Sequence, residues 1–329
     1  MRIAINGFGR IGRTLLRLAI AEGLDIVAIN DLADAKTLAH LFKYDSVHGV
    51  FKGNVAAKPD EIVIDDVTIP IFALKEAEQL PWSALKVDLV IDCTGRNLTR
   101  ETAEKHIVAG AKQVLISAPA ADDIPMIVLG VNDDQIDLTS TVLSNASCTT
   151  NNIAPMIKIL NDNWGVEEGY ITTIHSMTGD QNLHDTNHKD LRRARAASAS
   201  IIPTTTGAAK AITHIFPQLD GRLGGAGIRV PVLNGSLTDF TCLLKSKATI
   251  DEINAAFKQA AENELKNILQ YTEDPIVSID IIDNPHSCVF DSLLTSIVGD
   301  LVKVVGWYDN EFGYSSRLID VVKKLKAES

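Results

Sequence analysis

The chain opens with a strand, a glycine-rich turn and a helix, and this arrangement constrains the fold more than any other part of the sequence. Residues 2–5 are apolar, three glycines follow at positions 7, 9 and 12, and residues 10–22 have the apolar spacing of a helix. Gly7 allows the tight turn, Gly9 leaves room for a pyrophosphate, and Gly12 lets the helix pack closely. The pattern G-x-G-x-x-G therefore predicts a dinucleotide at the N-terminus of this helix.

An acidic residue stands at the sequence distance that such a site requires. A second strand, residues 24–30, ends at Asp31, which lies 31 − 12 = 19 residues beyond Gly12. An acid about 20 residues after the glycines accepts hydrogen bonds from the adenosine ribose and repels a 2′-phosphate. A glycine turn kept for packing alone is the alternative, but packing does not call for this acid. The sequence therefore predicts NAD in preference to NADP.

Strands and helices alternate in the first part of the chain. Apolar runs predict strands at 2–5, 26–29, 87–91, 113–116 and 126–129, and amphipathic patterns predict helices at 10–22, 34–43 and 100–109. Residues 61–72 predict a short hairpin that turns at Asp65 and Asp66. Buried strands connected by helices predict a doubly wound parallel sheet of the Rossmann type over residues 1–147.

The pattern changes after about residue 148. β-rich stretches at 169–176, 227–246, 276–282 and 287–308 alternate with predicted helices at 148–162, 207–215 and 250–268. Strands that follow one another without a helix predict a mainly antiparallel or mixed sheet. We therefore expect an α/β chain of two domains, with an α+β domain over 148–310 and a last helix from 311.

Charge, hydropathy and cysteine content exclude several classes of function. The 31 basic and 42 acidic residues give a formal net charge of −11, which argues against nucleic acid as a main partner. No apolar run reaches the roughly 18 residues of a membrane span, and we see no secretory leader. Four scattered cysteines do not form a disulfide framework or a paired zinc motif. We expect a reduced, cytoplasmic enzyme without a metal.

One cysteine lies where a helix is predicted to begin. The stretch S-N-A-S-C-T-T-N-N places Cys148 between an apolar strand and a helical pattern, with Ser147 and Thr149 as candidate caps. The N–H groups and dipole of a helix N-terminus stabilise a thiolate, the nucleophilic form of cysteine. A buried, inert thiol is the alternative. That alternative is expected for the cysteines in apolar strand patterns, Cys93, Cys242 and Cys288.

A histidine follows the strand Y-I-T-T-I. His175 stands where this strand enters a polar loop, and there it can accept the thiol proton and form an ion pair with the thiolate. A strand-end histidine bonded to a carbonyl is an equal alternative. His184 and His188 are spaced four apart but lack apolar helical periodicity, which favours a solvated loop over a metal pair.

Basic and hydroxyl residues cluster between positions 191 and 210. The stretch T-T-T-G-A-A-K at 204–210 combines hydroxyls with a glycine at a predicted helix start, which suits a phosphate. Arg229 is a lone arginine in an apolar strand and requires an anion. Arg192 and Arg193 fit either an anion site or a solvated or subunit-contacting face.

Three motifs are similar to those of one enzyme family. They are N-G-F-G-R-I-G at 6–12, S-N-A-S-C-T-T-N at 144–151 and W-Y-D-N-E-F-G-Y-S at 307–315, with further similarity at 188–197 and 201–211. The chain resembles the phosphorylating glyceraldehyde-3-phosphate dehydrogenases of glycolysis and gluconeogenesis over essentially its whole length. The resemblance implies oxidation of D-glyceraldehyde 3-phosphate to 1,3-bisphosphoglycerate with reduction of NAD, through a cysteine hemithioacetal and a thioester.

The resemblance also implies roles for individual residues. Cys148 is the implied nucleophile and His175 the implied base. Thr178 and Arg229 match the site of the substrate's phosphate, and Arg195 lies between it and the inorganic phosphate site. The residues implied for inorganic phosphate and its surroundings are Ser147, Thr149, Thr206 and Gly207. The residues implied to bind NAD are Gly7, Gly9, Arg10, Ile11, Gly12, Asp31, Ser117 and Asn310, of which Asn310 fixes the nicotinamide amide.

The family resemblance carries expectations about assembly and cofactor choice. It implies a homotetramer with the loop near 178–200 at a subunit interface, and a last helix, 311–329, that packs back on the first domain. Thr186 and Asn187 replace a Leu-Pro pair of many NAD-specific members, so some tolerance of NADP is expected. N-G-S-L-T-D-F at 234–240 also departs from the common family sequence, with no functional account from sequence.

Two other functions compete with this interpretation. Erythrose-4-phosphate dehydrogenase shares the cysteine motif, but Thr178 and the stretch 204–210 resemble the triose enzyme more closely. A dinucleotide-binding or RNA-binding regulator without turnover is the second, and the presence of Cys148, His175 and Arg229 argues against it.

Overall fold

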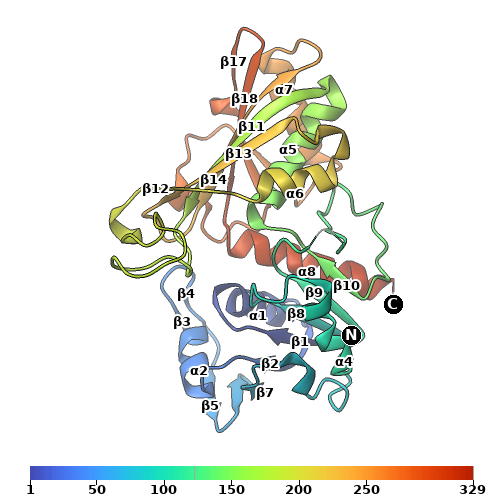
Figure 1. Cartoon of the computed structure of the whole chain (residues 1–329), viewed down its shortest axis with the longest axis vertical. Coiled ribbons are helices and arrows are strands. Elements are labelled where there is room, and N and C mark those ends of the chain that lie inside the picture. Colours follow the sequence, from blue (N-terminus) through green and yellow to red (C-terminus); the bar gives the residue numbers. More distant parts are fainter. Residues whose placement is uncertain (122, 329) are drawn as a thin grey trace. The chain divides into compact units, whose positions relative to one another are not determined.

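The chain folds into two compact units. The computed structural model describes residues 1–121 and 123–328, and Figure 1 labels its elements. The first unit contains Met1–Ile127, Gln135–Ala146 and the described residues from Ser315 onward, and the second contains Val128–Asp134 and Ser147–Tyr314. Within the described ranges, no helix has the length and apolar character that crossing a membrane requires.

The first unit is built on an eight-stranded sheet with β1 near its centre. The strand order is β10-β9-β8-β1-β2-β7-β6-β5, and the strands from β10 to β7 pair in parallel whereas β6 and β5 are antiparallel. The strands are β1 (Arg2–Asn6), β2 (Asp25–Asn30), β5 (Val55–Lys58), β6 (Glu61–Ile64), β7 (Val67–Phe72), β8 (Leu89–Asp92), β9 (Gln113–Ile116) and β10 (Val142–Ser144). The helices are α1 (Arg10–Ala21), α2 (Ala35–Lys43), α3 (Arg100–Ala103) and α4 (Lys105–Val108), and a small hairpin is formed by β3 (Tyr44–Asp45) and β4 (Gly49–Val50). The predicted doubly wound α/β fold is confirmed.

Parallel strands in this sheet are buried on both faces, which explains their continuous apolar runs. All four residues of β8 and all three of β10 are buried. The predicted hairpin is also present, because β6 and β7 pair antiparallel around Asp65 and Asp66, with Asp65 at a φ of 50°. Its second strand then joins the parallel sheet through Ile71, beside Ile29 of β2.

The predicted strand at 126–129 is wrong. Only Met126 forms a bridge, to Ser144, and the chain then turns. The Asn132 side chain accepts the main-chain N–H of Val128, and Gly130 has a φ of 77°, so the backbone cannot continue along the sheet. The apolar run is buried within a turn, a case that periodicity does not distinguish from a strand. The helix predicted at 100–109 is two short helices, α3 and α4.

The second unit is built on a mixed sheet. Its order is β12-β13-β11-β14-β18-β16-β15, with β17 paired to β18. β11 pairs parallel with β13, β15 pairs parallel with β16, and the other pairs are antiparallel. The strands are β11 (Val166–Ser176), β12 (Ile202–Thr204), β13 (Leu223–Val230), β14 (Ser236–Leu244), β15 (Leu269–Thr272), β16 (Cys288–Asp291), β17 (Ser296–Val298) and β18 (Leu301–Tyr308). The predicted mixed sheet is confirmed.

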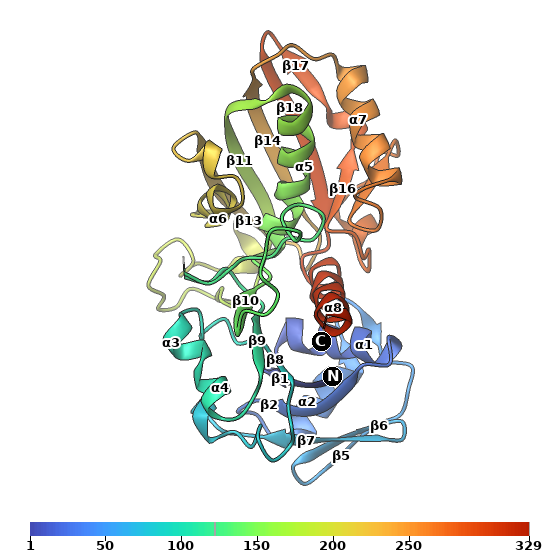
Figure 2. The same cartoon turned by 90° about the vertical axis from the view of Figure 1, so that its right-hand side faces the viewer.

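Helices α5 (Cys148–Trp164) and α7 (Ile250–Glu262) cover one face of this sheet, as Figure 2 shows, and α6 (Ala208–Ile215) lies beside α5. Alternate residues of β14 are buried beneath them, including Ser236, Thr238 and Phe240, whereas the residues between them are half-buried. This alternation is typical of a sheet with only one covered face.

Two segments of the second unit differ from the sequence-based expectation. The β-rich stretch at 276–282 contains no strand but a short 3-10 helix, Ser278–Ile281, because the Asp280 carboxylate accepts the N–H of Val277 and winds the chain. Helix α7 ends at Glu262 rather than near 268, and Asn267 has a φ of 67°.

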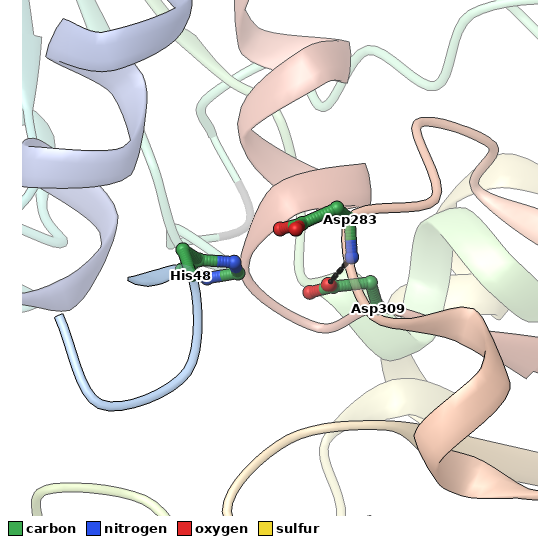
Figure 3. A group of neighbouring side chains, drawn as sticks. All are labelled: His48, Asp283 and Asp309. Atoms are coloured by element: carbon green, nitrogen blue, oxygen red, sulfur yellow. Dashed lines mark hydrogen bonds between the residues drawn. The ribbon is translucent and has the colours of Figure 1, made fainter. Parts of the chain in front are cut away.

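The turn between β18 and α8 (Phe312–Ala327) is fixed by one buried carboxylate. Asp309 accepts the N–H groups of Glu311 and Phe312 at 2.8 and 2.7 Å, and the side-chain amide of Asn234 at 2.8 Å. Figure 3 shows its second oxygen accepting the N–H of Asp283, at 2.9 Å. Burial raises the pKa of Asp309, and these hydrogen bonds act in the opposite direction.

We expect Asp309→Ala to destabilise the protein by about 3 kcal/mol, because buried donors lose their acceptor. Urea unfolding would measure this loss. Glu262→Ala, on the exposed end of α7, is the matched control and should change stability by less than about 0.5 kcal/mol. Equal effects of the two substitutions would show that the Asp309 hydrogen bonds do not fix the turn.

Candidate active site

The glycine turn has the geometry that a dinucleotide pyrophosphate requires. Gly7 has a φ of 92°, and a Cβ at Gly12 would lie 2.2 Å from the Gly7 carbonyl oxygen, so both positions need glycine for the fold itself. A Cβ at Gly9 would meet no described atom within 4 Å, so the space above the turn is open. Gly9 is the N-cap of α1 and provides no side-chain cap. The turn therefore fits an anion held by main-chain N–H groups.

Asp31 is held in place beside this turn. Its carboxylate accepts the main-chain N–H of Phe8 at 2.8 Å and that of Ala33 at 3.1 Å. Both contacts fix the acid at the carboxyl end of β2, where a ribose hydroxyl can bind to its remaining lone pairs. Ser117 follows β9 at the same edge of the sheet and donates its N–H to the Asp92 carbonyl.

Arg10 has a partner that sequence analysis did not identify. Its guanidinium donates two hydrogen bonds to Asp45, at 2.5 and 3.0 Å. Burial tends to raise the pKa of Asp45, but the pair with Arg10 holds it well below its usual range. Asp45 also accepts the N–H groups of Val47 and His48, so this pair ties α1 to the β3–β4 hairpin. The side chain of Arg10 is thus engaged within the first unit.

Cys148 is the first residue of α5, as the sequence predicts. Ser147 is the N-cap, and its Oγ accepts the N–H of Thr150 at 3.0 Å. Burial raises the pKa of the Cys148 thiol, whereas Arg229 and the N–H groups at the start of the helix lower it. The sulfur therefore lies where Arg229 and the N–H groups at the start of α5 stabilise a thiolate as it forms.

His175 is the partner of this sulfur. Its Nε2 lies 3.5 Å from Cys148 Sγ, and its Nδ1 donates to the Ser176 carbonyl oxygen at 2.8 Å. With Nδ1 as the donor, the neutral ring presents the unprotonated Nε2 to the thiol. Burial and the nearby Arg229 lower the pKa of His175 to about 3. Both effects favour the neutral ring, which with Nδ1 as the donor has the tautomer of a base.

A tyrosine that sequence analysis missed supports both groups. The Tyr308 hydroxyl lies 2.9 Å from Thr149 Oγ1 and 2.9 Å from Thr173 Oγ1, and its ring meets the His175 ring edge-on with centroids 6.0 Å apart. Thr149 therefore bonds to Tyr308 and does not cap the helix. The only sequence signal for Tyr308 is its position inside the third family-like motif.

Arg229 lies beside His175 because β11 and β13 run parallel. The two residues are paired in register, and Arg229 Nη1 donates to the same Ser176 carbonyl oxygen at 3.3 Å. Its buried Nε has no hydrogen-bond partner among the described residues. Burial lowers the pKa of Arg229. An anion is the natural partner for this side chain.

The loop after β11 holds two residues predicted to bind phosphate, Thr178 and Arg195, but they have different partners. The Thr178 hydroxyl donates to the Asp180 carboxylate, and Arg193 Nη1 donates to the same carboxylate at 2.6 Å. Arg195 instead bonds to Asp185 at 2.8 Å and is largely exposed. Asp180 was not among the predicted residues, and Arg193 was expected either in an anion site or on a solvated or subunit-contacting face. Thr206 and Gly207 do precede α6 as predicted, and Thr206 Oγ1 accepts the N–H of Ala208.

Asn310 is oriented by two serines. Its Oδ1 accepts the Ser176 hydroxyl at 2.8 Å and the Ser236 hydroxyl at 2.7 Å, and both serines are buried. Both lone pairs of the amide oxygen are therefore occupied, and Nδ2 is the group left to bind a ligand. Ser236 belongs to the departing stretch 234–240, for which the sequence suggested no role.

The other cysteines have the environment of unreactive thiols. Burial raises the pKa of Cys93 and of Cys242 to about 12 and also raises that of Cys288. Cys93 is nevertheless partly exposed, whereas the other two are buried. His184 and His188 lie in the loop between β11 and β12, as expected.

Comparisons with known proteins agree over both parts of the chain. Residues 1–100 match the family described as the NAD binding domain of glyceraldehyde 3-phosphate dehydrogenase, and residues 147–310 match its C-terminal domain. The chain is 54% identical over 325 residues to glyceraldehyde-3-phosphate dehydrogenase 2 of Streptomyces avermitilis, covering 98% of this chain and 97% of the relative. It is 52% identical over 330 residues to the glyceraldehyde-3-phosphate dehydrogenase of Mycobacterium tuberculosis, with the same coverage.

The chain belongs to the glyceraldehyde-3-phosphate dehydrogenase family. The resemblance inferred from the motifs is thereby confirmed, as is NAD as the cofactor of the first domain. A further member, from Clostridium acetobutylicum, is 52% identical over 325 residues, covering 97% of this chain and 96% of that relative. In this member of the family, Cys148 Sγ and His175 Nε2 are close enough to form a hydrogen bond.

Two glycines of the turn should differ in what they contribute. Gly9→Ala should leave the free energy of unfolding within about 0.5 kcal/mol of the wild type, since its Cβ enters open space, yet weaken NAD binding. Gly12→Ala should destabilise the fold by about 1–3 kcal/mol through overpacking. Calorimetric NAD titration and urea unfolding would separate the two effects. Unchanged NAD affinity in Gly9→Ala would contradict a pyrophosphate at this turn.

The lowered pKa of His175 also predicts a pH dependence of stability. The unfolded histidine binds a proton below about pH 6.5 and the folded one does not until about pH 3, so folding loses stability as the pH falls through this window. Between pH 7 and pH 5 the His175 contribution should fall by about 2 kcal/mol.

Urea unfolding at pH 7 and at pH 5 would test this prediction. Between these pH values, the free energy of unfolding should fall by about 2 kcal/mol less in His175→Gln than in the wild type. His184→Gln, on the exposed loop, should behave as the wild type does. An identical pH dependence in all three proteins would mean that His175 is not held neutral.

Proposed function

We propose that this chain oxidises D-glyceraldehyde 3-phosphate with NAD and inorganic phosphate to 1,3-bisphosphoglycerate, with Cys148 as nucleophile and His175 as base. The observation that supports it most is the 3.5 Å approach of His175 Nε2 to Cys148 Sγ at the first residue of α5. A thiol at a helix start, facing an unprotonated imidazole nitrogen, is the arrangement of an activated nucleophile.

The proposed sequence of steps uses each of these groups at a stated atom. Cys148 Sγ adds to the aldehyde carbon, and His175 Nε2 accepts the hydroxyl proton of the resulting hemithioacetal as hydride leaves. NAD, when bound, supplies the hydride acceptor. The thioester that remains retains the energy of oxidation, and inorganic phosphate then attacks its carbonyl carbon to release the acyl phosphate and the thiol.

Two anion subsites give these steps their orientation. We assign the substrate's phosphate to Arg229 and Thr178, because the Arg229 Nε lacks a partner among the described residues. Asp180 binds the Thr178 hydroxyl in the structure, so the phosphate competes with this carboxylate. Ser147, Thr149, Thr206 and Gly207 are assigned to inorganic phosphate, and Arg195 would leave Asp185 to bridge the two subsites. Such positioning lowers the entropic cost of reaction.

The cofactor residues belong to two domains in this proposal. Residues 1–147 form the NAD-binding domain with the glycine turn, Arg10, Ile11, Asp31 and Ser117, and residues 148–310 form the catalytic domain, whose Asn310 fixes the nicotinamide amide. The fixed Asp31 carboxylate supports preference for NAD, and Thr186 with Asn187 supports some use of NADP.

We further propose a cytoplasmic homotetramer, with the last helix belonging to the NAD-binding domain. Alternate residues of β14 are only half-buried, and exposed apolar side chains, Tyr170 on β11 and Ile201 directly before β12, are as expected for subunit contacts. Free cysteines agree with a reducing compartment.

The test is NADH absorbance with glyceraldehyde 3-phosphate, with and without inorganic phosphate. Cys148→Ser should abolish phosphate-dependent NADH formation but keep NAD affinity, because hydroxyl is a far weaker nucleophile than thiolate. Cys242→Ser, which changes a buried thiol of raised pKa, is the matched control and should remain active.

The same assay separates the competing functions. Faster turnover of erythrose 4-phosphate would replace the triose assignment. RNA binding without NADH formation would indicate a regulator, and near-normal activity of Cys148→Ser would remove this nucleophile.

A further inference from the structure

A row of buried polar side chains crosses the carboxyl ends of three neighbouring parallel strands in the first unit. Asn30 of β2, Asn6 of β1 and Asp92 of β8 are in register. Asn30 Nδ2 donates to Asn6 Oδ1 at 2.7 Å, and Asn6 Nδ2 donates to Asp92 Oδ2 at 2.8 Å. All three are buried, in a sheet whose other central residues are apolar. Because burying polar side chains costs free energy that apolar residues would not, we infer that this row does more than fill the core.

The row continues into α4 and the loop before β8. Trp82 Nε1, which can only donate, bonds to His106 Nδ1 at 2.9 Å. Nδ1 is therefore an acceptor, and the neutral imidazole carries its proton on Nε2, which lies 3.3 Å from Asp92 Oδ2. Trp82 and His106 are both fully buried. His106 is thus held by Trp82 on one side and donates from Nε2 to Asp92 on the other, where Asn6 Nδ2 lies 3.2 Å from the same nitrogen.

Among the described residues, the hydrogen-bond partners of Asp92 are neutral donors and His106, with no lysine or arginine. Besides Asn6 and His106, its oxygens accept Asn97 Nδ2 at 2.7 Å and both the N–H and the hydroxyl of Thr94, at 3.0 and 2.6 Å. Burial tends to raise the pKa of Asp92, but His106, Thr94 and Asn97 hold it below its usual range. Loss of one donor leaves a buried charge partly unsatisfied.

These donors come from the loop on which the glycine turn rests. Thr94 and Asn97 lie in the loop after β8, and Thr94 Oγ1 also accepts the N–H of Arg96. A Cβ at Gly7 would lie 2.9 Å from the Cys93 carbonyl carbon, so the turn and this loop are in direct contact. Cys93 also donates its N–H to the Asn6 carbonyl at 2.7 Å. The position of Asp92 therefore fixes the loop, and the loop fixes the turn.

We propose that His106 and Asp92 are positioning residues for the pyrophosphate of NAD: His106 holds Asp92, and Asp92 holds the loop 93–97 against the glycine turn. Neither residue needs to touch the cofactor. The proposal rests on NAD binding at Gly7–Gly12, which the open space at Gly9 and the fixed Asp31 support. It predicts that NAD affinity depends on a hydrogen-bond donor at position 106.

Direct NAD binding to purified variants, measured by calorimetry without substrate, tests this dependence. His106→Phe keeps a buried ring but removes the donor, and its Kd for NAD should rise by about 10-fold or more. His106→Gln can donate to Asp92 and accept from Trp82, and its Kd should stay within about 3-fold of the wild type. The KM for glyceraldehyde 3-phosphate and kcat at saturating NAD should change little in either variant.

A packing control separates positioning from stability. Val114→Ala weakens the same sheet at a buried position of β9 outside the polar row. Each variant's Kd is compared with its thermal unfolding midpoint. If Val114→Ala loses as much NAD affinity as His106→Phe at an equal loss of stability, or if His106→Gln fails to restore affinity in a stable protein, the positioning role is overturned. A wild type that does not bind NAD would instead overturn the proposed function.

Discussion

The contact between Cys148 Sγ and His175 Nε2 is the interaction on which the rest of the site depends. It requires a helix that begins at residue 148, which the Ser147 cap provides, and a ring whose other nitrogen is occupied, which the Ser176 carbonyl ensures. Burial disfavours charge on both partners, whereas Arg229 favours the thiolate and disfavours the imidazolium. Burial therefore disfavours charge separation between the two side chains, and Arg229 favours a negative charge on the sulfur.

Sequence reasoning predicted the parts of the fold and site that local patterns encode. The glycine turn, Asp31, the cysteine at a helix start and the histidine at a strand end all lie where their neighbours in sequence require. The strand predicted at 126–129 was wrong because these residues form a buried turn, held by Asn132, whose apolar composition is the same as that of a strand. The strand predicted within 276–282 was wrong because the Asp280 carboxylate accepts the N–H of Val277, three residues earlier, and the chain forms a 3-10 helix.

Partners from distant segments could not be predicted, because no local pattern records them. Tyr308 reaches Thr149 across more than 150 residues, and Arg10 meets Asp45 through the β3–β4 hairpin. The resemblance implies a phosphate-binding role for Arg195, and in the structure its guanidinium bonds to Asp185, a contact that depends on the conformation of the loop. The buried row from Asn30 to Trp82 depends on strand register, which appears only when the sheet is assembled.

The shared carbonyl of Ser176 has a consequence for how substitutions combine. One carbonyl oxygen accepts both the imidazole N–H of His175 and the guanidinium of Arg229, so the two side chains share an anchor in the backbone. A change at either side chain therefore alters the surroundings of the hydrogen bond that orients the other. Double-mutant cycles across these two side chains should accordingly be strongly non-additive.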